Sequence, residues 1–177
     1  MAKWDPLANG GTGQWSTLGS GLNCSIGALA FEYAGRLYAG GAFTNIGGTA
    51  ANKIAMWNGT SWSALGTGMN SSVNAIVFDS TGNLYAGGQF TCAGGSTSSG
   101  TYPTNTCAGS GGTDVYNGIA KWNGTKWSPL ETGIYFTIYT FAFDSSGNLF
   151  AGGLFNQAGG LVRPFIAKWM TALSIWL

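Results

Sequence analysis

The chain has 177 residues, which suits one domain, and it is nearly neutral, with seven Lys and Arg against six Asp and Glu and no His. So few basic residues, spread along the chain, argue against a nucleic-acid-binding surface. No apolar run approaches the ~18 residues of a membrane span, and the opening MAKWDPLANG lacks the apolar segment of a signal peptide.

Tryptophans occur in four pairs, which indicates an internal repeat. Trp4 and Trp15 bracket a Gly-rich stretch near the start, and Trp169 and Trp176 form the last pair. Between them the chain reads WNGTSW at 57–62 and WNGTKW at 122–127. Asn-Gly is a strong hairpin signal because both residues tolerate a positive φ.

The repeat has a period of about 47 residues, in the range of propeller blades. Residues 53–95 align with 118–160 without a gap, and 24 of the 43 positions are identical. The motif AGG begins at 39, 86 and 151, so its spacings are 47 and 65. The extra length of the second interval lies in one insertion, about Thr91 to Asn117.

Each unit is predicted to contain four short strands, because aromatic and branched residues alternate between Gly, Asn and Ser turns. In the middle unit these are 73–79, 83–90, 117–122 and 126–130. No window has a helical stripe of apolar residues. We therefore predict an all-β, antiparallel fold.

The paired tryptophans are predicted to be structural. If each Asn-Gly loop joins two strands, Trp57 faces Trp62 and Trp122 faces Trp127. Such cross-strand aromatic pairs stabilise a hairpin by about 0.2–1 kcal/mol. Each pair would then clasp the outer hairpin of its unit. The alternative is that the rings are exposed platforms for sugars.

The stretch GNLYAGGQF, then IAKW and a later Trp and Leu, resembles the kelch-type propeller blade. It is also similar to the IAKWNGTSW repeats of extracellular bacterial propellers. The resemblance covers nearly the whole chain outside the insertion and implies four-stranded blades. Kelch-fold copper oxidases need metal-binding histidines, and this chain has none, so that activity is not implied.

Blade counting predicts an incomplete ring within a single domain, 1–177. Residues 2–18 supply half a blade, and complete blades are expected at about 22–66, 69–131 and 134–177. Closed propellers typically have four to eight blades. Either copies of the chain associate, with contacts near 2–18 and 165–177, or the chain is part of a longer propeller.

No catalytic or metal site is predicted. The six carboxylates form no acid–base pair, and Asp79 and Asp144 occupy the same turn of different units; the full set is Asp5, Glu32, Asp79, Asp114, Glu131 and Asp144. Calcium needs six to eight oxygen ligands, often from several carboxylates, whereas each of these turns offers one. Three cysteines without histidine or a CxxC motif do not suit zinc. We expect no enzyme activity and no cofactor.

Three functions remain open from the sequence. The first is a self-associating extracellular structural module, such as an appendage, fibre or surface array; the second is a multivalent lectin; the third is a kelch-type protein-interaction scaffold. Four sites match the N-glycosylation pattern, which matters only in a eukaryotic secretory setting: Asn23, Asn58, Asn70 and Asn123. Expected partners are other copies of the chain and, for the lectin, glycans.

We predict a disulfide between Cys92 and Cys107, which bracket the Gly/Ser/Thr-rich part of the insertion. In the chain-entropy model, closing a loop of this length contributes roughly 3 kcal/mol. The bond implies an oxidising location, and Cys24 is left without a partner in the chain. Mass spectrometry of unreduced peptides should find the two cysteines linked. Free alkylation of both thiols in the native protein would contradict the bond and the extracellular location.

Overall fold

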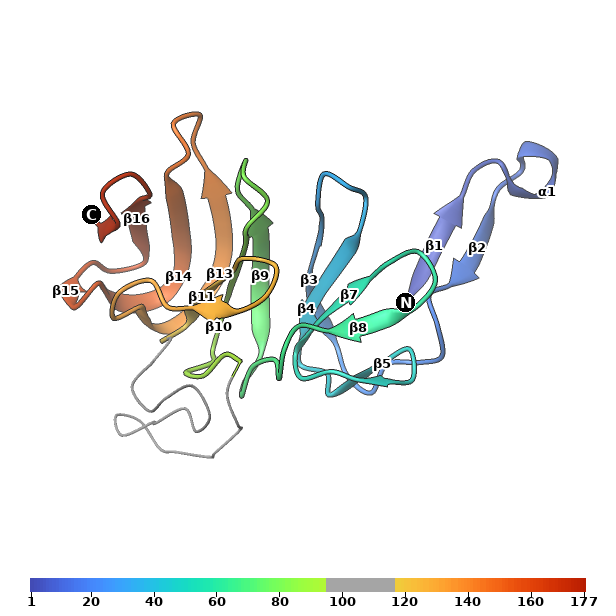
Figure 1. The fold of residues 1–177 in the computed structure, drawn as a ribbon, viewed down its shortest axis with the longest axis horizontal. Helices are drawn as coiled ribbons and strands as arrows, with labels where there is room; N and C mark the ends of the chain where they lie inside the picture. Colours follow the sequence, from blue (N-terminus) through green and yellow to red (C-terminus); the bar gives the residue numbers. More distant parts are fainter. Residues whose placement is uncertain (95–116) are drawn as a thin grey trace.

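The computed structural model describes residues 1–94 and 117–177. Three antiparallel sheets stand side by side in chain order, with a two-stranded hairpin beside the first (Figure 1). The prediction of an all-β, antiparallel fold is confirmed. Most of the predicted insertion, with Cys107 and Asp114, lies outside the described residues.

The first sheet has the strand order β3-β4-β7-β8. Its strands are β3 (Ile26–Phe31), β4 (Leu37–Gly41), β7 (Ile54–Trp57) and β8 (Trp62–Ala64). A small ladder of β5 (Asn45–Ile46) and β6 (Thr49–Ala50) lies between β4 and β7 in the chain.

The second sheet repeats this order as β9-β10-β11-β12. Its strands are β9 (Val73–Phe78), β10 (Leu84–Gly88), β11 (Ile119–Trp122) and β12 (Trp127–Ser128). They coincide with the four strands predicted for the middle unit, each trimmed at its ends.

The third sheet has the order β13-β14-β16-β17, with a short fifth strand on β14. The strands are β13 (Ile134–Phe143), β14 (Leu149–Ala158), β15 (Leu161–Val162), β16 (Ile166–Met170) and β17 (Ile175–Trp176).

The first two strands of the third sheet are longer than their counterparts, and Asn70 is one of the residues that differ where the ladder is extended. In the second sheet the side-chain oxygen of Asn70 accepts the backbone N–H groups of Thr91 and Cys92, both at 3.0 Å. Tyr135 occupies the corresponding position and pairs with Gln157 in the β13–β14 ladder. Backbone pairing replaces the asparagine cap, so the ladder continues.

The N-terminal hairpin consists of β1 (Ala2–Asp5) and β2 (Gln14–Thr17). The one helical turn described, α1 (Ala8–Gly11), lies in its loop and has left-handed backbone angles at Asn9 and Gly10. The hairpin extends away from the first sheet (Figure 1), and both of its strands are exposed.

Each tryptophan pair lies across neighbouring strands, as the clasp interpretation requires. Trp57 pairs in register with Trp62, and Trp122 with Trp127. Their ring centroids are 5.4 and 5.2 Å apart, with tilted planes. The first and last pairs have the same geometry, at 5.5 and 5.2 Å.

The second tryptophan of a pair also links its sheet to the preceding unit. The indole N–H of Trp127 donates a hydrogen bond of 3.1 Å to the carbonyl of Leu65, at the end of the first sheet. The same bond occurs at the two other junctions, from Trp62 to Leu18 at 2.9 Å and from Trp176 to Leu130 at 3.4 Å. The sequence did not indicate this role, because the acceptors are backbone carbonyls.

We expect Trp127→Ala to lower the free energy of unfolding by about 3–5 kcal/mol, the range for a buried large-to-small aromatic change. Trp127 is 6% exposed and its indole is hydrogen-bonded. Trp15→Ala is the matched control, because Trp15 holds the same repeat position but is 64% exposed. Urea denaturation of both variants measures the difference. Equal losses would contradict a structural role that depends on burial.

Candidate functional site

The three sheets pack through equivalent faces. We call the side of a sheet that faces the preceding unit its front face, and the opposite side its rear face. On the rear face of the first sheet, Tyr38 meets Phe78 from the front face of the second, with centroids 5.0 Å apart in an edge-to-face arrangement. Ile54 is fully buried in the same cluster, and Ile76 packs against it.

The second junction repeats the first. Tyr85 on the rear face of the second sheet meets Phe143 of the third, again edge-to-face, at 5.4 Å. Ile119, the counterpart of Ile54, is fully buried, and Phe141, the counterpart of Ile76, packs against the cluster. Edge-to-face aromatic pairs contribute about 0.5–1.5 kcal/mol beyond the area that they bury.

Glycines in the second strand allow the sheets to approach. A β-carbon added at Gly40 would lie 2.5 Å from Val73, and one at Gly87 would lie 2.5 Å from Phe141. Both distances are far below van der Waals contact, so any larger residue would push the next sheet away. The AGG motif of the sequence therefore has a packing role in addition to its place in the strand.

On the front face of the first sheet, the apolar residues of β3 are not covered by a preceding sheet. Leu29 and Phe31 hold the positions of Ile76 and Phe78, yet they are 52% and 68% exposed. Met1 and Leu18, at the base of the hairpin, pack against the cluster around Leu37. The strand β3 is thus left with two uncovered apolar side chains.

The rear face of the third sheet is uncovered as well. Ile166 is 65% exposed, whereas Ile54 and Ile119 in the same repeat position are fully buried. Phe150 holds the position of Tyr38 and Tyr85 and is half-buried. A β-carbon at Gly152 would meet only Thr140 and the carbonyl of Phe165, both in the third unit itself.

These two surfaces form the candidate functional site, named here the front end face (Leu29, Phe31) and the rear end face (Phe150, Gly152, Ile166). They lie on β3 and on β14 with β16. The expected contact ranges, 2–18 and 165–177, include only Ile166 of these residues. At the rear end face Lys168 lies over the Phe150 ring at 5.4 Å, as Lys121 lies over Tyr85 at 5.6 Å. The Lys168 ammonium is also 3.6 Å from the Asp144 carboxylate, with which it forms an ion pair.

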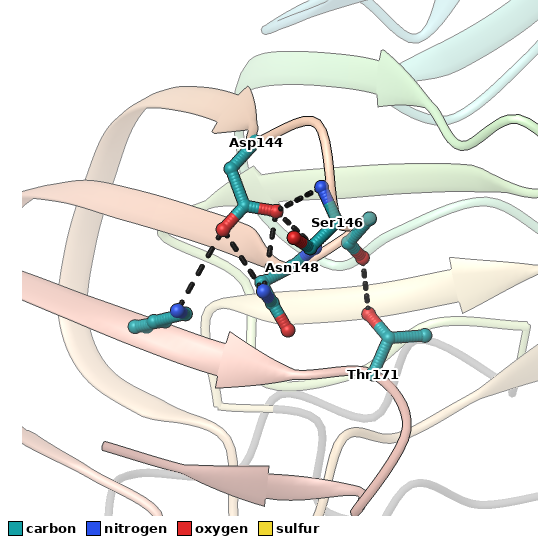
Figure 2. Close-up of polar contacts among 6 residues, drawn as sticks. Asp144, Ser146, Asn148 and Thr171 are labelled. Carbon is teal, nitrogen blue, oxygen red and sulfur yellow. Dashed lines mark hydrogen bonds and ion pairs between the residues drawn. The ribbon is translucent and has the colours of Figure 1, made fainter.

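The carboxylates of the repeated aspartate turns are hydrogen-bonded mainly within their own loops. In Figure 2 the carboxylate of Asp144 accepts the backbone N–H of Ser146 at 3.0 Å and that of Asn148 at 2.9 Å. The Asn148 side chain donates to it at 2.9 Å, and Thr171 donates to the carbonyl of Gly147 at 2.7 Å. Asp79 makes the same bonds to Thr81 and Asn83.

The first unit has an ion pair in place of this network. Glu32 holds the position of Asp79, and Arg36 holds that of Asn83 and donates to the Glu32 carboxylate. Within residues 1–94 and 117–177, no group of three metal-binding side chains comes together. The acidic turns are therefore structural elements of the loop between the first and second strands.

The four glycosylation candidates occupy two kinds of position. Asn58 and Asn123 lie in exposed hairpin turns, where their side-chain oxygens accept backbone N–H groups of the turn. Asn23 and Asn70 cap the loop after the second strand, and their side-chain amides donate to Thr44 at 2.7 Å and Thr91 at 3.0 Å. N-glycosylation at these four asparagines stays a prediction.

Cysteines contribute nothing to the end faces. Cys92 is buried in the cluster between the first two sheets, and its predicted partner Cys107 lies outside the described residues. Cys24 is exposed and free.

A cavity of about 370 Å³ is lined by Phe90, Ile134 and Phe136 among others. Thr91 and Asn117 also line it, close to the two ends of the part of the chain not described.

Stability should fall in acid because of Asp79 and Asp144. Burial alone would raise the pKa of Asp79, but hydrogen bonds from Asn83 and Thr81 outweigh it and hold the pKa below its usual value. Hydrogen bonds from Asn148 lower the pKa of Asp144. A carboxyl with a lowered folded-state pKa stabilises the fold above its unfolded pKa of about 4, and this contribution disappears as the pH falls further.

Urea midpoints measured below about pH 4 should therefore decline with pH. The Asp79→Asn/Asp144→Asn double variant cannot ionise at these turns and should decline less steeply, approaching the parent protein at the lowest pH. Parallel curves for the two proteins would contradict this assignment.

Comparisons with other proteins add no family assignment: no protein-family model and no curated protein sequence matches this chain. In the described part of the chain no helix has the length and hydrophobicity needed to cross a bilayer.

Proposed function

We propose that the protein is a non-catalytic, self-associating structural module built of propeller-type blades, three complete ones and an N-terminal half-blade. The observation that carries the proposal is the pair of uncovered end faces: at both internal junctions the corresponding rear-face residues are buried and the corresponding front-face residues are partly buried. Exposed apolar surface of this kind is typical of an interaction site. An extracellular location, as an appendage, fibre or surface array, accords with the low charge of the chain.

Within residues 1–94 and 117–177, the aspartates of the repeated turns act as loop elements, which favours binding over catalysis. Asp79 and Asp144 lie in turns of different sheets, and each accepts hydrogen bonds from its own turn. Neither has a second carboxylate of its turn as a partner. Such side chains set the shape of a loop.

The carbohydrate-binding alternative has less support. Trp57 and Trp122 are partly buried against their partner rings, and Trp62 and Trp127 are buried with hydrogen-bonded indoles. A sugar platform needs an open aromatic face with polar groups around it. A glycan array on the parent protein tests this alternative. The kelch-type scaffold differs from our proposal only in the partner, which would be another protein.

Self-association is tested by light scattering of the purified chain over a micromolar concentration series. We expect masses above the 18.2 kDa of one chain, increasing with concentration because the end faces of one copy can contact another. High salt should leave the association intact or strengthen it, since the faces are apolar. A folded β-protein that stays at 18.2 kDa throughout the series would contradict the proposal.

A further inference from the structure

We infer that the rear end face of one copy docks on the front end face of a second copy, head to tail, and so forms a third junction of the kind that the chain contains twice. This inference rests on the proposed self-association and assigns its geometry. The occupant is a second copy because the chain itself provides both halves of the contact.

The aromatic positions of the two end faces match. At both internal junctions a rear-face ring, Tyr38 or Tyr85, meets a front-face phenylalanine edge-to-face at 5.0 and 5.4 Å. The unused rear-face ring is Phe150, and the unused front-face phenylalanine is Phe31. Head-to-tail docking brings Phe150 of one copy against Phe31 of the next.

The aliphatic positions match in the same way. Gly40 and Gly87 each receive a front-face side chain so closely that a β-carbon would clash with it. Gly152 has the same position on β14 but no side chain from another unit in front of it. Leu29 of the second copy, the counterpart of Ile76 and Phe141, has the size to fill the space in front of Gly152. Ile166 lies beside Gly152 on the same face of the first copy.

Charge does not oppose the contact. Lys168 lies over the Phe150 ring, and Lys121 lies over Tyr85 at the second junction, where Tyr85 is almost fully buried. A facing sheet can therefore pack against a rear face that carries a lysine at this repeat position. The contact uses different surfaces on the two partners, so it leaves one free face of each kind and can propagate.

The N-terminal hairpin must move aside for the arriving outer strands. Its connection to the first sheet is at its base, where Leu18 bonds to Met1 and accepts the indole N–H of Trp62. Trp4 and Trp15 are both largely exposed. The inner strands of the arriving copy, β13 and β14, meet β3, which the hairpin leaves uncovered.

Two variants, each blocking one face, test the inference. Phe31→Lys blocks the front end face, and Ile166→Lys blocks the rear end face; both residues are exposed, so the folded monomer should tolerate the lysine. Each variant alone should be monomeric. Mixed in equal amounts, they should form a dimer of twice 18.2 kDa and nothing larger, because one intact face of each kind remains.

Leu7→Lys is the matched control, since Leu7 is exposed on the hairpin loop, away from both end faces; it should associate like the parent protein. Far-UV circular dichroism and thermal melts check that all variants are folded. Both introduced charges are positive, so dimer formation in the mixture cannot come from an ion pair between the two introduced side chains.

The outcomes separate the inference from the proposed function. If the parent protein associates but the single variants associate equally well, or if the mixture stays monomeric, head-to-tail docking is wrong while self-association stands. If the parent protein is monomeric at every concentration, both are wrong. A mixture that grows beyond the dimer would also overturn the assignment, because it requires a further contact surface.

Discussion

The close approach of neighbouring sheets at a glycine in each second strand is the constraint on which the fold depends. Gly40 and Gly87 bring the next sheet close enough for a rear-face tyrosine to meet a front-face phenylalanine. At the same junctions the indole of the last strand donates a hydrogen bond to a carbonyl in the preceding unit. A side chain at either glycine would separate the inner strands and weaken the aromatic contact.

Much of the fold follows from the sequence, because strand periodicity and turn residues are local signals. The four strands of the second sheet, the Asn-Gly hairpins and the tryptophan pairing are all legible in the repeated WNGT and AGG motifs. The greater length of β13 and β14 is not legible there. Tyr135 pairs with Gln157 in the backbone ladder, whereas Asn70 at the same position accepts a backbone N–H with its side chain. The loss of a capping residue leaves no motif in the sequence from which a longer strand could be predicted.

The candidate site was harder to anticipate than the fold. From the sequence, contacts between copies are expected near 2–18 and 165–177, and this stays a prediction. The uncovered residues Leu29 and Phe31 lie in the first strand of their unit, and Phe150 lies in the second strand of its unit. Their sequence positions look like ordinary core positions, because in the other units they are core. Only their exposure distinguishes them, and exposure depends on which neighbouring sheet is present.

The stacking of the sheets has a consequence for how the molecule opens. Among the described residues the main contacts between sheets join neighbouring sheets, and the stability of such a stack approximates a sum of neighbour terms. The second sheet has two neighbours, while the third has one. Amide hydrogens of β9 and β10 should therefore exchange with solvent most slowly, and those of β16 and β17 earlier, through fraying that leaves the centre intact. Any contact that covers an end would extend this protection outward along the stack.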